Sequence, residues 1–69
     1  MLNKESDERG KIEDVLRNAL EVEENQMREY LITAERIHDD PELKERLENF
    51  AQGNAKRSKQ LSDELSENQ

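Results

Sequence analysis

The segment Asp39-Asp40-Pro41-Glu42 divides the chain into two stretches that each have the periodicity of an amphipathic helix. Asp40 is a favourable N-cap residue, Pro41 suits the first position of a helix, and Glu42 complements the positive end of the helix dipole. Because proline disfavours the α conformation in the residue before it, the preceding helix must end before Asp40. The chain is therefore constrained to form two consecutive helices with a short connection.

Hydrophobic residues recur at helical spacing on both sides of this boundary. They are Ile12, Val15, Leu16, Ala19, Leu20, Met27, Tyr30, Leu31, Ala34 and Ile37 before it, and Leu43, Leu47, Phe50, Ala51, Leu61 and Leu65 after it. We predict helices over residues 11–38 and 41–66, a flexible tail over residues 1–10 and a short tail over residues 67–69. One or two residues between the helices require an antiparallel hairpin, and the fold class is all-α.

The hydrophobic face of the first helix is wider than one neighbouring helix can cover. Val22 and Ile32 flank the main stripe, while only 30% of all residues are hydrophobic and 42% are charged. A single hairpin of this composition buries little apolar surface. We therefore expect a homodimer that forms a four-helix bundle. The competing expectation is a monomer that folds against another helical protein.

Charge and composition exclude several other classes of partner. The net charge of -7 disfavours nucleic acid and anionic membranes, because phosphate groups would be repelled. No run approaches the roughly 20 apolar residues of a membrane span. The absence of cysteine excludes disulfides and thiolate metal sites. We expect an acidic cytoplasmic protein.

Both hydrophobic stripes are interrupted by polar residues near their midpoints. Glu23 interrupts the first, and Asn54 and Arg57 interrupt the second. With the turn near Asp40, Glu23 is level with about residue 56, so we predict one central polar layer. A buried carboxylate needs a partner, either a metal ion or the Arg57 guanidinium with Asn54 completing the hydrogen bonds. We favour the ion pair. Two alternatives stay open: Glu23 reaches solvent, or Asn54 fixes register as in coiled coils.

The segments ALEVEENQMREYLITAERI (19–37) and DPELKERLENFAQGNAKRSKQLSDEL (40–65) resemble a ferritin-like, rubrerythrin-type helix pair. In that family a ligand glutamate precedes a tyrosine by seven residues, as Glu23 precedes Tyr30 here. The family's second helix carries Glu-x-x-His, and the resemblance places Asn54 and Arg57 on those two ligand positions. Asparagine is a poor iron ligand and arginine is not a ligand. The resemblance therefore implies a helix pair with degenerate metal ligands.

These observations favour a non-enzymatic oligomerisation or protein-interaction module. A regulatory role is one function that such a module could have. We predict no catalytic residue, no cofactor-binding residue and no cofactor. The alternative is a ferritin-like protein that binds two iron ions at a site formed across subunits, with Glu23 as a ligand.

Overall fold

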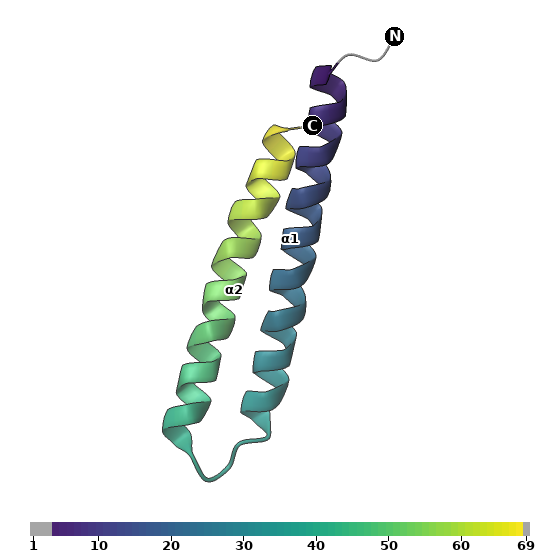
Figure 1. Ribbon diagram of the computed structural model, residues 1–69. Coiled ribbons are helices and arrows are strands. Elements are labelled where there is room, and N and C mark those ends of the chain that lie inside the picture. The colour runs from purple at the N-terminus through teal and green to yellow at the C-terminus, as the bar shows by residue number, and fades with distance from the viewer. Residues whose placement is uncertain (1–3, 69) are drawn as a thin grey trace.

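In a computed structural model, which describes residues 4–68, the chain forms two helices and no strand in that range. Helix α1 spans Lys4–Glu35 and helix α2 spans Pro41–Glu67. The helices lie side by side and run in opposite directions, so that the start of α1 and the end of α2 lie at the same end of the molecule (Figure 1). The molecule measures 62 × 15 × 11 Å along its principal axes. The predicted all-α hairpin is confirmed.

Helix α1 begins seven residues earlier than the predicted start at residue 11. Residues 4–10 belong to the helix instead of a flexible tail, while residues 1–3 lie outside the described part. Lysine, glutamate and arginine dominate residues 4–9 and are good helix formers. A single interior glycine costs only about 1 kcal/mol. Gly10 therefore does not end the helix.

Helix α1 also ends earlier than predicted, at Glu35 instead of residue 38. The Arg36 N–H donates to the Thr33 carbonyl at 3.0 Å, and the Ile37 N–H donates to the Ala34 carbonyl at 3.2 Å. Hydrogen bonds from an N–H to the carbonyl three residues earlier tighten the last turn of a helix before the helix ends. Residues 36–40 then form the connection that reverses the chain direction. This connection is longer than the one or two residues expected.

Helix α2 begins at Pro41, as the sequence predicts, and ends at Glu67, one residue beyond the predicted end. Asp40 Oδ1 accepts a hydrogen bond of 3.0 Å from the Leu43 N–H, so Asp40 is the N-cap. At the other end, Asn68 donates from its side chain to the Glu64 carbonyl at 2.7 Å. Of the predicted tail over residues 67–69, Glu67 is helical, Asn68 caps the helix, and residue 69 lies outside the described part.

The seam between the helices contains very few buried side chains. Among the described residues, Ala34 and Ala51 are 2% exposed and Leu65 is 9% exposed, and these are the buried hydrophobic residues. The rings of Tyr30 and Phe50 are in contact, with centroids 5.5 Å apart and planes inclined by 50°. Neither helix, over the range that the structure describes, is long and apolar enough to cross a membrane.

Candidate functional site

Asn54 lies at the centre of a polar cluster between the two helices. Its side chain is 1% exposed, and its Nδ2 donates to Glu23 Oε1 at 2.6 Å and to Gln26 Oε1 at 3.3 Å. Glu23 and Gln26 are three residues apart on α1, so they lie on the same side of that helix. The Asn54 amide therefore joins the midpoints of the two helices.

Arg57 binds the same carboxylate from the solvent side. Its Nε donates to Glu23 Oε2 at 2.9 Å, and the side chain is 53% exposed while that of Glu23 is 18% exposed. The guanidinium lies beside Gly53, where a Cβ atom would be 3.4 Å from Arg57 Nη1, an ordinary van der Waals contact. Each oxygen of Glu23 thus accepts a hydrogen bond from a different residue of α2.

These two hydrogen bonds favour the ionised form of Glu23. The Arg57 guanidinium and then the Asn54 amide lower the pKa of the Glu23 carboxyl, while partial desolvation opposes them. Both donors favour the ionised form. Glu23 is therefore an anion at neutral pH and forms an ion pair with Arg57.

Two polar atoms near the cluster are buried without a hydrogen-bond partner in the described part of the chain. They are Asn54 Oδ1 and Ser58 Oγ. Residues 54 and 58 are one helical turn apart on α2. A buried acceptor without a donor costs stability, so the burial of Asn54 between the helices has an energetic cost.

The structure brings Glu23, Asn54 and Arg57 together by direct hydrogen bonds, and the candidate polar layer consists of these residues with Gln26. Gln26 was missed by sequence reasoning, although its position three residues after Glu23 was an available signal. Asp40 lies apart from this layer at the start of α2, where it caps the helix.

The cluster does not fit a metal centre within one chain. Among the described residues, no group of three or more His, Cys, Asp or Glu side chains could hold a metal ion. Both oxygens of Glu23 accept hydrogen bonds from α2. The Arg57 guanidinium also carries the positive charge that a metal ion would supply.

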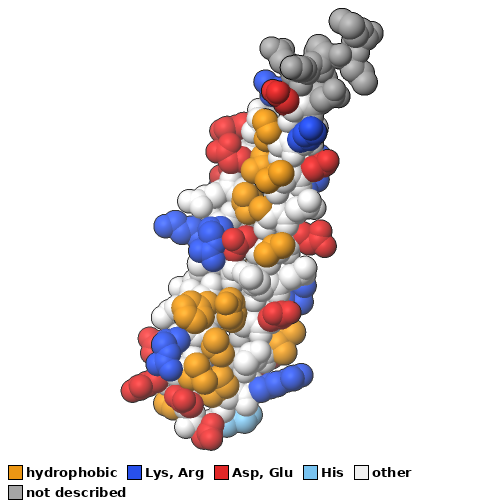
Figure 2. All heavy atoms as spheres, viewed as in Figure 1, with side chains coloured by type: hydrophobic (Ala, Val, Ile, Leu, Met, Phe, Trp, Pro, Cys, Tyr) orange, Lys and Arg blue, Asp and Glu red, His pale blue; other side chains and the backbone are white. Residues whose placement is uncertain are grey.

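Large hydrophobic side chains are exposed on more than one side of the hairpin. Figure 2 shows a face on which hydrophobic side chains follow the long axis and are interrupted about half-way by charged side chains of both signs. The exposed large hydrophobic residues are Ile12, Val15, Val22, Leu31, Ile32 and Phe50. Monomeric soluble proteins rarely expose large contiguous apolar patches.

Comparison with protein-family models, with curated proteins and with solved structures finds no match to this chain.

Proposed function

We propose that this protein is a non-enzymatic oligomerisation module whose hairpin is one half of a homodimeric four-helix bundle. The observation that carries this proposal is the imbalance between buried and exposed apolar residues. Six large hydrophobic side chains are 44–66% exposed, whereas the buried hydrophobic residues of the described chain are two alanines and one leucine. Burying a large aliphatic or aromatic side chain stabilises a fold by about 1.5–3 kcal/mol. The favourable burial that the hairpin lacks is available at a subunit interface.

The size of the molecule is compatible with such an interface. A standard interface covers about 800 Å² on each partner. That is roughly one seventh of the 5695 Å² accessible surface of the hairpin. Because the hairpin is long and narrow, one face can supply this area without any change in the path of the chain.

Size-exclusion chromatography with light scattering tests the proposal. We expect a mass of twice 8.1 kDa at micromolar concentration, and a melting temperature that rises with protein concentration because association stabilises the folded hairpin. A cooperatively folded species of 8.1 kDa whose melting temperature is independent of concentration would overturn the proposal.

Metal analysis of the same chromatographic peak separates this proposal from the ferritin-like alternative. The Glu23–Arg57 ion pair supports a module that needs no metal. Stoichiometric iron or manganese in the purified dimer, lost in Glu23→Ala, would instead support a two-metal site formed across subunits.

A further inference from the structure

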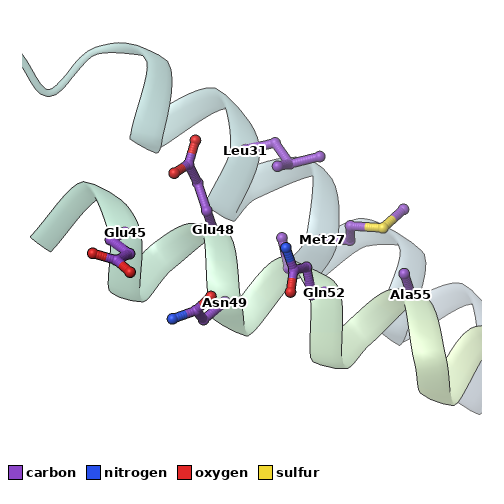
Figure 3. Close-up of a pocket in the computed structure, with 8 residues that line it drawn as sticks. Met27, Leu31, Glu45, Glu48, Asn49, Gln52 and Ala55 are labelled. Atoms are coloured by element: carbon purple, nitrogen blue, oxygen red, sulfur yellow. The ribbon is translucent and has the colours of Figure 1, made fainter.

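A groove runs between the helices near the turn, and its two walls differ in size. Met27 and Leu31 line it from α1, while Ala51 and Ala55 line it from α2 together with the polar residues Glu45, Glu48, Asn49 and Gln52. Figure 3 shows Met27 and Leu31 on one helix and Glu45, Glu48, Asn49, Gln52 and Ala55 on the other. The groove has a volume of about 580 Å³, and Leu31 is 44% exposed. The apolar side chains of the α1 wall are thus long, and those of the α2 wall are single methyl groups between polar side chains.

Charged residues border this groove on both helices. Residues three or four apart lie on one face of a helix. The border of α1 is therefore made of residues at this spacing from Leu31, and the border of α2 of residues at this spacing from Ala55. The charged residues on the two borders are Arg17, Glu21, Glu24, Arg28 and Glu35 on α1, and Glu45, Glu48, Lys59 and Asp63 on α2. Each border carries both signs, with one acidic step of two residues on each helix, Glu21 with Glu24 and Glu45 with Glu48.

The register of the hairpin decides which charged residues of the two borders lie at the same level. Tyr30 contacts Phe50, and Gln26 is hydrogen-bonded to Asn54, which fixes how the two helices align. By this alignment Arg17 is level with Asp63, Glu21 with Lys59, and Arg28 with a point one turn from Glu48, so three of these levels bring opposite charges together. Glu35 is level with Glu45, a like charge. The hairpin itself does not join these pairs, because its ion pairs on these borders run along each helix, Arg17 to Glu13 and Lys59 to Asp63.

We propose that the groove is the interface with a second copy, related by a two-fold axis parallel to the helices, so that both turns lie at the same end. This inference rests on the proposed function and specifies its face and orientation; of the six exposed large hydrophobic residues, Leu31 is the one that lines this groove. The axis places α1 of each copy beside α2 of the other. Leu31 and Met27 of each copy then enter the space above Ala51 and Ala55 of the other, and Arg17, Glu21 and Arg28 of each copy lie near Asp63, Lys59 and Glu48 of the other.

The opposite orientation does not use this complementarity. A two-fold axis perpendicular to the helices places α1 beside α1 and α2 beside α2, with the turns at opposite ends. The large residues of α1 then face each other, and the small residues of α2 face each other. The complementary charged borders of α1 and α2 stay apart.

The opposite face of the hairpin is a poorer interface, although it also exposes apolar residues. Arg57 lies on that face near the middle of its length, paired with Glu23 and 53% exposed. An interface centred there would desolvate both copies of this ion pair, which is costly. The groove is lined by apolar and polar residues, with Glu45 and Glu48 among them, but not by either member of the Glu23–Arg57 ion pair.

A distance measurement distinguishes the two orientations. The chain has no cysteine, so His38→Cys, on the exposed turn, can carry a single spin label per copy. We expect electron-spin distances below about 30 Å when the turns lie at the same end, because packed helices are about 8–10 Å apart. At a rise of 1.5 Å per residue, turns at opposite ends would give about 45 Å or more, and this result would overturn the proposed orientation.

Paired variants test the face. Leu31 and Ile32 are neighbours with the same 44% exposure, but only Leu31 lines the groove. We expect Leu31→Glu to raise the dissociation constant at least tenfold (a rough figure) and Ile32→Glu to leave it almost unchanged. Val15→Glu probes the opposite face, where Val15 is 66% exposed, and should also leave the dimer intact. Dissociation by Val15→Glu with no effect of Leu31→Glu would place the interface on that opposite face.

A charge exchange between subunits completes the test. Arg28→Glu and Glu48→Arg should each weaken self-association by about tenfold, because two like-charged contacts form in each dimer. An equimolar mixture should recover the affinity of the unmodified protein, because the mixed dimer contains only opposite-charge contacts. An effect within one chain could not be reversed by mixing, so failure of recovery would refute the groove interface. A protein that is monomeric before any substitution would refute the proposed function itself.

Discussion

Replacing Asn54 by aspartate keeps the shape of the side chain and reverses its role toward Glu23. The Nδ2 donor, 2.6 Å from Glu23 Oε1, becomes a carboxylate oxygen at a position that is 1% exposed. Two hydrogen bonds worth about 1 kcal/mol each are lost. A buried charge without a partner adds several kcal/mol, so we expect a total loss of about 3–5 kcal/mol in the free energy of unfolding. A chain of 69 residues has roughly 3–10 kcal/mol in all, so the variant should be largely unfolded at neutral pH.

The pH dependence of this variant should be opposite in sign to that of the unmodified protein. The lowered pKa of Glu23 stabilises the native fold above the ordinary carboxyl pKa, and this contribution is lost as the pH falls through the lowered value. In Asn54→Asp, repulsion raises the pKa of the carboxyl pair in the folded state, so acidification relieves the strain. From pH 7 to about pH 5 the variant should therefore gain stability while the unmodified protein changes little.

Thermal unfolding followed by circular dichroism at the two pH values measures both effects. Asn18→Asp is the matched control, because it adds the same charge to the same residue type at an exposed helical position that does not line the groove. If Asn54→Asp and Asn18→Asp melted at the same temperature at pH 7, the reasoning about the buried amide would be refuted.

Three further substitutions test other parts of the hairpin. Gly53→Ala should stabilise the helix by about 0.5–1 kcal/mol in urea unfolding, because its Cβ would touch only the movable end of Arg57; destabilisation would show that the guanidinium cannot shift. Asp40→Ala should cost about 1 kcal/mol, since the Leu43 N–H loses its acceptor, and an unchanged urea midpoint would contradict this. Arg57→Ala should lower the melting temperature more than Glu23→Gln, because only Arg57→Ala leaves the carboxylate without its guanidinium; equal, near-zero effects would mean that both groups are solvated.

The parts of this structure that depend on local chemistry are readable from the sequence. Asp40 and Pro41 specify the start of α2 because capping and the proline ring act within a few residues. The spacing of Glu23 and Asn54 from the turn is sufficient to place them at one level. The start of α1 was not readable, because the weak effect of Gly10 competes with the sum of several favourable propensities.

The depth of each polar side chain could not be derived from spacing alone. Asn54 and Arg57 are three residues apart and lie on nearly the same face of α2, yet Asn54 is 1% exposed and the Arg57 side chain is 53% exposed. A small rotation of α2 about its axis decides which of them lies in the seam. The tertiary packing of the two helices fixes that rotation. The spacing of hydrophobic residues along the sequence is not precise enough to predict the rotation.

Because few side chains are buried between α1 and α2, few positions of this protein should be intolerant of substitution for reasons of packing within one subunit. In an ordinary domain, positions that resist substitution are mostly buried inside the subunit. Here three hydrophobic residues of the described chain are buried, and Asn54 is the buried polar one. Positions beyond these four and the helix caps that prove intolerant in a saturation mutagenesis screen would therefore outline the surface that other molecules cover. For this hairpin, the positions that do not tolerate substitution would mark the surface that contacts a partner.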